Sequence, residues 1–274
     1  MFDFISPLRK VREGEPLVQC ITNFVTVNDC ANIILAAGGS PTMSEDIREV
    51  EESVCHVDAL VCNMGAIDFT DSMILAGKKA NRLGIPVVLD PVAAGGTSLR
   101  REMSDKLLKE VHFTAIRGNA SEILYLAGKS SIGSGVDVAA EDVITEDNIS
   151  QTVEAAKSLA KKINSIIAVS GPIDIVTDGE TTALVRNGCA TMSRITGSGC
   201  MLTSLIGAFC GSNRDDYFSA VCSAMAAMGI SGEIAEEKRI EKSSGNATYR
   251  TDLIDAVFYI TEDKLEGGFR YELY

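Results

Sequence analysis

The sequence predicts an α/β fold whose central sheet is mostly parallel and is covered by helices on both faces. Short apolar runs alternate with helix-length amphipathic segments along most of the chain. Several of these runs are almost wholly apolar, which is typical of strands covered on both faces. Polar residues follow the runs, at the strand ends where such sheets bind ligands. We expect a single domain over residues 1–274, because a chain of this length that is 46% hydrophobic can bury a sizeable core.

Seven runs have the composition expected of strands. In chain order they are Leu17–Thr22, Ala59–Asn63, Pro86–Asp90, Phe113–Ile116, Ile166–Ser170, Ile173–Thr177 and Thr181–Val185. Asp178-Gly179-Glu180 separates the last two runs and predicts a hairpin turn. The repeated order of strand, helix and strand in the rest of the chain indicates a mostly parallel sheet.

The predicted helices lie between the strands and in the last third of the chain. Those between the strands include Asp71–Leu83, Ser98–Val111 and Gln151–Ile163. From Gly199 to about Lys264 the pattern is helical, with small residues frequent in Gly199–Gly211 and Asp215–Glu237. Residues 133–148 are acidic and show no clear period, so we expect a surface loop there.

The charge of the chain excludes one class of function. The net charge is −13, from 38 acidic and 25 basic residues, and no block of Lys and Arg is long. A nucleic-acid binder needs a positive surface that displaces counterions from phosphates, so we expect no nucleic acid as partner. An anionic ligand must then be held by a local device, such as backbone amides, a metal ion or a single Arg.

The cysteines and the apolar runs indicate in which cellular compartment the protein is expected. Eight cysteines form no CxxC pair and there are only two histidines, so neither a zinc site nor a disulfide framework is expected. The N-terminus lacks the pattern of a signal peptide. No uncharged apolar run is long enough to span a membrane, and residues 199–210 come closest. We therefore expect a cytoplasmic protein without a membrane partner.

The strongest functional motif is the glycine-rich segment before the small-residue helix. Gly197, Ser198 and Gly199 precede it and free several amides to point at one place. A helix N-terminus carries unpaired N–H groups and a partial positive charge, which suit a phosphoryl group in transfer. The alternative is a turn that only starts a tightly packed helix. The sequence lacks a GxxxxGK[ST] loop, and no GxGxxG follows a strand.

Cys200 lies in the first turn of this predicted helix, where the pKa of a thiol tends to fall. The functional interpretation is a thiolate that orients or deprotonates a substrate hydroxyl. The alternative is a buried small hydrophobic residue, like the other seven cysteines. Only the neighbouring motif favours the functional interpretation.

Polar residues end three of the predicted strands. Asp90 follows an apolar strand and is placed to hold Mg²⁺, or alternatively to cap a turn before Pro91. Ser170 ends another strand with a hydroxyl, for which an ordinary turn is the alternative.

The third strand end carries a longer polar segment. Arg117 offers a planar fork for a phosphate, Asn119 or Ser121 could cap the next helix, and Glu122 would face the same cleft as Asp90. The alternative is a capped helix with a surface Arg. Three polar groups after a buried strand favour a functional site.

Six motifs in order resemble the hydroxyethylthiazole kinase family of the ribokinase-like superfamily. They are Ile21-Thr22-Asn23-Phe24-Val25-Thr26-Val27-Asn28-Asp29-Cys30-Ala31-Asn32, Gly39-Ser40-Pro41-Thr42-Met43, Asn63-Met64-Gly65, Leu89-Asp90-Pro91-Val92-Ala93-Ala94-Gly95, Ile116-Arg117-Gly118-Asn119-Ala120-Ser121-Glu122 and Thr196-Gly197-Ser198-Gly199-Cys200-Met201-Leu202. The resemblance runs from about Gln19 to Ile254. It implies a ribokinase-like three-layer sandwich and phosphorylation of 4-methyl-5-(2-hydroxyethyl)thiazole by ATP in thiamine salvage. It also implies a homotrimer with active sites between subunits.

The resemblance also implies roles for single residues. Cys200, with Gly197, Ser198 and Gly199, would form the catalytic site. The residues implied to bind the thiazole are Met43, Gly197, Asn23, Val25 and Gly65, some of them across a subunit boundary. Those implied to bind ATP are Arg117, Ser170 and Asn119, and those implied to hold Mg²⁺ are Asp90 and Glu122.

Two positions are informative about the branch of the superfamily. Ser170 stands where the family commonly has Thr, so the hydroxyl is kept. Cys200 stands where the wider superfamily has an Asp base, a departure characteristic of the thiazole kinases. Two alternatives remain open: a related kinase for hydroxymethylpyrimidine or pyridoxal, and a non-catalytic ligand-binding regulator. The metal and phosphate residues argue against the regulator, because a binding protein has no need of them.

Overall fold

The computed structural model describes residues 2–129, 144–146 and 148–274. Within them the sheet consists of β1 (Leu17–Ile21), β2 (Ser40–Thr42), β3 (Ala59–Asn63), β4 (Val87–Asp90), β5 (Ala115–Asn119), β6 (Ile166–Ser170), β7 (Asp174–Thr177), β8 (Thr182–Val185) and β9 (Tyr271–Leu273). Their order is β2-β1-β3-β4-β5-β6-β7-β8-β9. Neighbouring strands are parallel from β2 to β6 and antiparallel from β6 to β9. The prediction of a mostly parallel sheet is confirmed.

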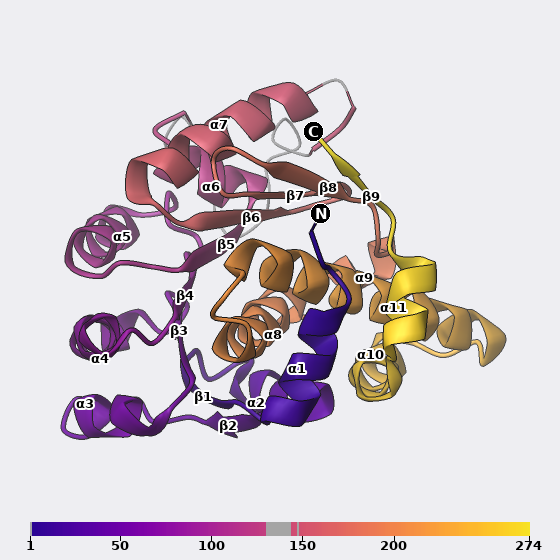
Figure 1. Ribbon diagram of the computed structural model, residues 1–274, viewed down its shortest axis with the longest axis horizontal. Helices are drawn as coiled ribbons and strands as arrows, with labels where there is room; N and C mark the ends of the chain where they lie inside the picture. The colour runs from indigo at the N-terminus through magenta and orange to yellow at the C-terminus, as the bar shows by residue number, and fades with distance from the viewer. Residues whose placement is uncertain (1, 130–143, 147) are drawn as a thin grey trace.

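Helices cover both faces of this sheet. They are α1 (Ser6–Gly14), α2 (Val27–Ala37), α3 (Val50–Ser53), α4 (Thr70–Leu83), α5 (Ser98–Glu110), α6 (Ala120–Leu126), α7 (Ile149–Ile163), α8 (Ser198–Ser212), α9 (Tyr217–Glu241), α10 (Asn246–Tyr259) and α11 (Glu262–Gly268). Figure 1 shows α3, α4, α5 and α7 on one face, and α1, α8, α9 and α10 on the other. The predicted three-layer arrangement is therefore confirmed.

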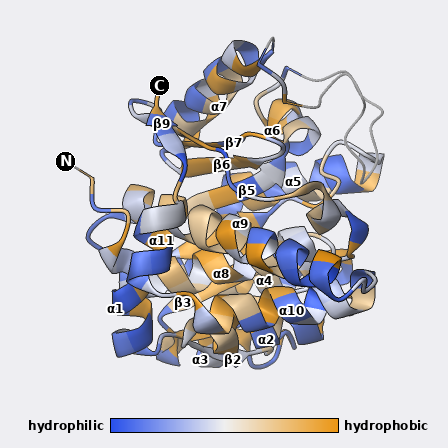
Figure 2. Ribbon diagram, turned by 90° about the vertical axis from the view of Figure 1, so that its right-hand side faces the viewer, coloured by the Kyte–Doolittle hydropathy of each residue, from blue (hydrophilic) through white to orange (hydrophobic). Residues whose placement is uncertain are grey.

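Each face of the sheet has its own apolar core. One core joins α8 and α9 to the sheet, and the other joins α4 and α7 to the opposite face. In Figure 2 the apolar colour is concentrated in α8 and α9, whereas α1 carries polar residues on its outer side. Gly207 lets α8 approach the sheet closely, because a Cβ there would lie 2.4 Å from Val61 Cγ2. A larger residue at this position would push α8 away from the sheet.

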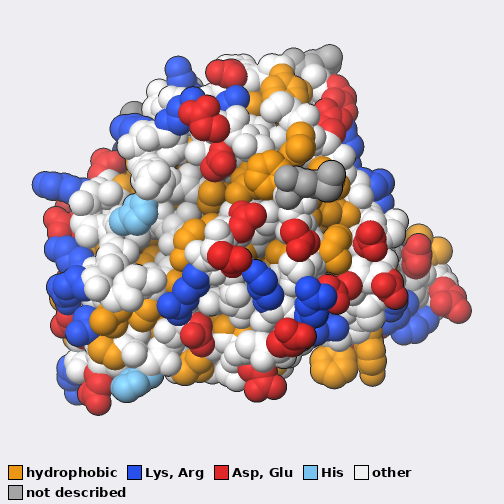
Figure 3. All heavy atoms as spheres, in the orientation of Figure 1, with side chains coloured by type: hydrophobic (Ala, Val, Ile, Leu, Met, Phe, Trp, Pro, Cys, Tyr) orange, Lys and Arg blue, Asp and Glu red, His pale blue; other side chains and the backbone are white. Residues whose placement is uncertain are grey.

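Helix α9 corrects the expectation about apolar runs. It is long and apolar enough to cross a membrane by length and composition, and so exceeds residues 199–210 in this respect. However, 89% of its apolar window is buried inside the protein. In this structure α9 is a core helix. On the molecular face shown in Figure 3, acidic and basic side chains are interspersed.

The structure contains elements that the sequence patterns did not predict. Helices α1 and α2, the short edge strand β2 and the C-terminal strand β9 belong to this group. Strand β5 begins and ends later than predicted, because Asn119 pairs with Ser170 in the ladder to β6. The hairpin is confirmed: β7 and β8 are antiparallel, and Gly179 has a positive φ of 97°. The predicted loop over residues 133–148 lies largely outside the described residues.

Candidate functional site

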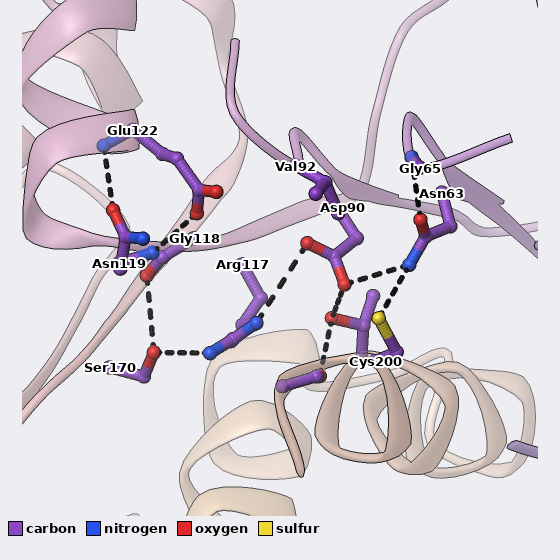
Figure 4. A network of polar contacts seen from close by, with 12 residues as sticks. Asn63, Gly65, Asp90, Val92, Arg117, Gly118, Asn119, Glu122, Ser170 and Cys200 are labelled. Carbon is purple, nitrogen blue, oxygen red and sulfur yellow. Dashed lines mark hydrogen bonds and ion pairs between the residues drawn. The ribbon is translucent and has the colours of Figure 1, made fainter. Parts of the chain in front are cut away.

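Polar side chains from adjacent strands meet at the carboxyl ends of β3 to β6. The parallel register places Asn63 beside Asp90 and Asn119 beside Ser170. The N-terminus of α8 lies at the same edge, as Figure 4 shows. Apolar strands covered on both faces bury their length, so polar groups can reach a cleft only where the strands end. The strand-end residues that the sequence predicted as a site are therefore brought together.

The glycine-rich segment forms the start of α8. Gly197 is the N-cap residue with a φ of 82°, a left-handed conformation that favours glycine, and no side chain among the described residues caps the helix. The first helical hydrogen bond runs from the N–H of Met201 to the oxygen of Gly197 at 2.8 Å. The amides of residues 198–200 come before this bond and belong to the positive end of the helix. The predicted helix N-terminus is confirmed.

Gly199 lies directly against the guanidinium of Arg117. A Cβ at position 199 would lie 2.3 Å from Arg117 Nη1, a distance no real Cβ can occupy. Arg117 also donates a hydrogen bond from Nη2 to Ser170 Oγ. Its Nη1 lies 3.8 Å from Asp90 Oδ1, and the two side chains are 12% and 1% exposed. One cation thus connects the start of α8 to two strand ends.

Two buried carboxylates, Asp90 and Glu122, lie around this cation. Burial raises the pKa of Asp90, although Arg117 opposes the shift. Burial and the nearby Asp90 charge raise the pKa of Glu122 to about 7, against the effect of Arg117. Glu122 accepts hydrogen bonds from the N–H groups of Ala93 and Asn119, both at 2.8 Å. The two carboxylates are close enough for the charge of Asp90 to raise the pKa of Glu122, as expected for groups in one cleft.

These carboxylates fit a magnesium ion. Asp90 Oδ1 is buried and has no hydrogen-bond partner among the described residues. Mg²⁺ prefers oxygen ligands and is commonly held by one or two carboxylates together with water and substrate phosphates. The described residues contain no cluster of three or more His, Cys, Asp or Glu side chains that could hold a metal by themselves. The donor set suits an ion that arrives with phosphates.

Cys200 contradicts the predicted thiolate. Burial and the nearby Asp90 charge raise the pKa of its thiol to about 12, so the thiol stays protonated at neutral pH. The prediction relied on the helix N-terminus, which lowers a thiol pKa, but here loss of hydration and a like charge outweigh it. The sulfur accepts hydrogen bonds from Asn63 Nδ2 at 3.1 Å and Asn23 Nδ2 at 3.6 Å. We call Asn23, Asn63, Asp90, Cys200 and Thr203 the thiol network.

The residues expected to bind the acceptor differ in how close they lie to the thiol network. Gly65 is in contact with the thiol network, because a Cβ there would lie 2.7 Å from Asn63 Oδ1 and 2.9 Å from Asn23 Nδ2. Gly197 lies against Thr26, in the loop that follows Asn23. A Cβ at position 197 would lie 2.5 Å from Thr26 Cγ2. The side chain of Val25 is exposed.

Met43 follows β2 at the edge of the sheet, where it is partly buried against the core of α8 and α9.

Asn119 lies at the start of α6. It caps that helix, and its side chain and that of Glu122 form a capping box. This contact confirms the predicted cap. The predicted contact of Asn119 with ATP stays a prediction.

A cavity of about 540 Å³ opens beside the start of α8, and we call it the α9 cavity. At one end it is lined by Arg117, Ser170, Ser198 and Gly199. The rest of its lining includes Asn187, Gly188, Cys189, Met192, Met225, Met228 and Gly229. Its size lies within the range of small-ligand sites, about 300–1,000 Å³. The cavity therefore combines a cationic end with a largely apolar remainder.

Several residues of the site escaped the sequence analysis. Thr203 donates to Asp90 Oδ2 at 3.1 Å, and Asn63 donates to the same oxygen at 3.0 Å. Asn63 ends a predicted strand, so the rule that singled out Asp90 could have found it. Asp174 lines the cavity and accepts the Gly171 N–H at 2.8 Å, and burial raises its pKa to about 7. Residues 187–193 form no regular strand and gave no signal.

Comparisons with known proteins agree with the geometry. The model of the Hydroxyethylthiazole kinase family matches residues 8–263. A protein named hydroxyethylthiazole kinase from Clostridium acetobutylicum is 46% identical over 269 residues, covering 97% of this chain and 98% of its own. The solved structure of the hydroxyethylthiazole kinase protein from Pyrococcus horikoshii OT3 is 34% identical with a TM-score of 0.86, covering 99% of this chain and 98% of its own.

A more distant structure has the same fold. The pyridoxal kinase from Staphylococcus aureus, solved with AMP-PCP and pyridoxal, has a TM-score of 0.57 and 16% identity, covering 80% of this chain and 87% of its own. This likeness shows the ribokinase-like three-layer fold alone. The family model, the 46% identity and the site geometry agree, and this chain belongs to the hydroxyethylthiazole kinase family.

Proposed function

We propose that this protein transfers the γ-phosphate of ATP to the hydroxyl of 4-methyl-5-(2-hydroxyethyl)thiazole in thiamine salvage, as one kinase domain over residues 1–274. One observation carries the proposal: the uncapped N-terminus of α8 lies between the thiol network and the α9 cavity. An acceptor and a donor of phosphate can thus approach the same amides from two sides. The names of the similar proteins from Clostridium acetobutylicum and Pyrococcus horikoshii support this choice of acceptor.

The residues at the junction of the two sides bind and stabilise the phosphate in transfer. Arg117 and Ser170 contact the phosphates of ATP, and the amides of residues 198–200 neutralise the moving phosphoryl group. The rest of the nucleotide occupies the α9 cavity, with Asn119 as a further ATP contact. Transfer has a loose transition state with little bond formation to the nucleophile, so positioning and charge stabilisation dominate over base strength.

Cys200 positions the acceptor hydroxyl and does not act as a thiolate, because its thiol is protonated at neutral pH. Asn23 and Gly65 form the wall of the thiazole site beside it, and Gly197 lies at the start of α8. Met43 and Val25 complete the site from its edge. A protonated thiol suffices here, since the alcohol proton need not be removed before the phosphoryl group departs from ATP.

Asp90 and Glu122 hold Mg²⁺ in this proposal. The bound ion would neutralise phosphate charge during transfer. The buried Oδ1 of Asp90, which accepts no hydrogen bond from the described residues, and the raised pKa of Glu122 support the assignment, since each carboxylate lacks full compensation of its charge. Arg117 neutralises only part of this charge, because it lies 3.8 Å from Asp90 and also binds Ser170.

The protein acts as a homotrimer in the cytoplasm, with each active site at a subunit boundary. Two exposed apolar side chains support a subunit boundary at the site. Phe24 is 90% exposed and Val25 is 57% exposed, and both come directly after Asn23 of the thiol network. Large apolar side chains at this exposure favour burial against a partner. Size measurement by light scattering tests the trimer, and a Phe24→Ser variant that stays trimeric with normal activity contradicts the boundary.

The reaction is tested by incubating the purified protein with ATP and Mg²⁺ and one of three alcohols. These are the thiazole alcohol, hydroxymethylpyrimidine and pyridoxal. We expect release of ADP and a monophosphate, detected by mass, with the thiazole alcohol as the preferred acceptor. Preference for another alcohol assigns the protein to a different acceptor. Binding of ATP without transfer to any of the three indicates a regulator and contradicts the proposal.

A further inference from the structure

Asn63 is a buried side chain of the site to which no role has yet been assigned. It ends β3, is 1% exposed and pairs with Asp90 in the parallel register. Two polar side chains therefore lie next to each other at adjacent strand ends. A primary amide has two N–H donors and an oxygen with two lone pairs, and burial makes each of them costly to leave unpaired.

All four hydrogen-bonding positions of Asn63 are used. Nδ2 donates to Asp90 Oδ2 at 3.0 Å and to Cys200 Sγ at 3.1 Å. Oδ1 accepts from the N–H of Gly65 at 2.8 Å and from Asn23 Nδ2 at 3.4 Å. Exchange of nitrogen and oxygen would set the oxygen against the Asp90 carboxylate and the amide hydrogens against the Gly65 N–H. Only one orientation of this amide is therefore compatible with its neighbours.

Asn63 donates to Asp90 and to Cys200. In the proposed function Asp90 holds Mg²⁺ and Cys200 positions the acceptor hydroxyl. Asp90 Oδ2 is shared by Asn63 and Thr203, which leaves Oδ1 facing Arg117. The sulfur of Cys200 accepts a hydrogen bond from Asn63, so its lone pairs on this side are occupied. A single rigid amide thus fixes the separation of the carboxylate and the thiol.

We infer that Asn63 is a positioning residue for the transfer: it holds the Cys200 thiol and the Asp90 carboxylate in register and closes the turn at Gly65. The inference rests on the proposed function. Asn63 itself is covered by these partners, so it acts through them. Its loss lowers turnover more than it lowers the affinity for ATP, because its four hydrogen bonds go to the thiol network and to Gly65, and none goes to a residue that lines the α9 cavity.

The test compares two variants of Asn63 in two backgrounds. Asn63→Asp keeps the shape and an acceptor for Gly65 but replaces both donors by a second carboxylate beside Asp90, whereas Asn63→Leu removes all four contacts without adding charge. We expect kcat for thiazole phosphorylation to fall about 10²-fold in each, with KM for ATP changed less than about threefold, because misplacement by about 1 Å has this cost. In a Cys200→Ala background the same substitutions should cost only about tenfold, since one of the two held groups is gone.

Asn81 provides the matched control. Its side chain donates one hydrogen bond and accepts one, both with the backbone of His112 and both at 2.8 Å, whereas Asn63 makes two of each. Asn81→Asp should leave kcat within about twofold of the parent, as expected of a substitution away from the site. Thermal unfolding of every variant separates loss of fold from loss of position. If Asn63→Leu does not fold, Asn63→Asp provides the same comparison.

The outcomes separate this inference from the proposed function. Parental kcat in Asn63→Asp, or an equal loss in the parent and Cys200→Ala backgrounds, overturns the positioning role while the kinase assignment stands. A parent protein that phosphorylates neither the thiazole alcohol nor another alcohol overturns the proposed function, and the positioning role with it.

Discussion

The thiol network and the α9 cavity lie on opposite sides of the start of α8 and are built differently. The thiol network consists of buried polar side chains from several elements, held by mutual hydrogen bonds. The wall of the α9 cavity includes residues 187–193, which enter a short 3-10 helix over Ala190–Arg194, and methionines on α9. Methionine is flexible and adapts to a ligand, whereas a saturated polar network permits one arrangement. Changes in the network should therefore lower kcat, and changes in the cavity wall should raise KM for ATP.

The largest effect is expected at the junction of the two regions. Gly199→Val should abolish transfer, a loss of more than about 10³-fold in kcat/KM, because the side chain displaces Arg117 and covers the amides at the start of α8. Gly199→Ala should lose about 10²-fold, since its Cβ alone collides with the guanidinium. Steady-state kinetics with ATP and the thiazole alcohol measure both.

Gly267→Ala is the control for these glycine variants. It lies in α11, and a Cβ there meets nothing within 4 Å. Alanine favours a helix over glycine by about 1 kcal/mol, so neither alanine variant should lose stability through propensity. A Gly199→Val protein with the turnover of the parent contradicts the site assignment for both regions.

The sequence predicted the parts of the site that follow simple strand-end logic. Asp90, Arg117 and Ser170 end apolar runs, and the parallel order of the strands brings them to one edge. Asn63 ends a strand in the same way, but its importance depends on partners such as Cys200 that lie far away in the sequence. Such contacts are set by the packing of α8 on the sheet, which local patterns do not encode.

The two errors have physical causes of the same kind. The pKa of Cys200 rises because burial and Asp90 outweigh the helix N-terminus, and burial is a property of the whole fold. Strand β9 was missed because its three exposed residues gain their pairing from β8 alone. The cavity wall at residues 187–193 has no period and could not be predicted.

A smaller effect is expected within the thiol network itself. Cys200→Asp should keep kcat within about tenfold of the parent, because a carboxylate also accepts from Asn23 and Asn63 and the loose transition state asks little of the base. Cys200→Ala should lose more, since both asparagine donors are left without a partner. Single-turnover rates measure the transfer step directly. A larger loss in Cys200→Asp than in Cys200→Ala contradicts this account.

In the wall of the α9 cavity, the expected effect is on nucleotide affinity. Glu233 accepts the N–H of Gly188 at 2.6 Å and pairs with Arg270 at 2.5 Å, so it ties the wall to the C-terminal segment. Glu233→Gln should raise KM for ATP about fivefold with kcat unchanged, since it weakens a charge-assisted contact worth about 1 kcal/mol.

Glu51→Gln is the control for Glu233. Glu51 lies on α3 and pairs with Arg82 at 3.2 Å, and neither residue lines the α9 cavity. Its KM for ATP should equal that of the parent. A fall in kcat for Glu233→Gln without a change in KM would mean that the wall acts on transfer, and the contrast between the two regions would then fail.

The smallest effect on turnover is expected for substitution of Asp174. Its effect should be seen in the free energy of unfolding and in the way that this energy depends on pH. Burial raises its pKa to about 7 from an ordinary value of 3.8. Between these values the folded protein binds more protons than the unfolded chain, so the free energy of unfolding falls as the pH rises. Asp174→Asn keeps an acceptor for the Gly171 N–H and removes the titration. From pH 5 to pH 8 the parent should lose roughly 2.5 kcal/mol relative to the variant.

Urea unfolding of both proteins at pH 5 and pH 8 gives this difference directly. The comparison between parent and variant cancels the titration of every group that both share, Glu122 and Asp90 included, provided that the substitution leaves them unchanged. Parallel dependence on pH in the two proteins would mean that the carboxyl of Asp174 is hydrated in the α9 cavity. The wall would then be open to water at this point, in contrast to the closed thiol network across the start of α8.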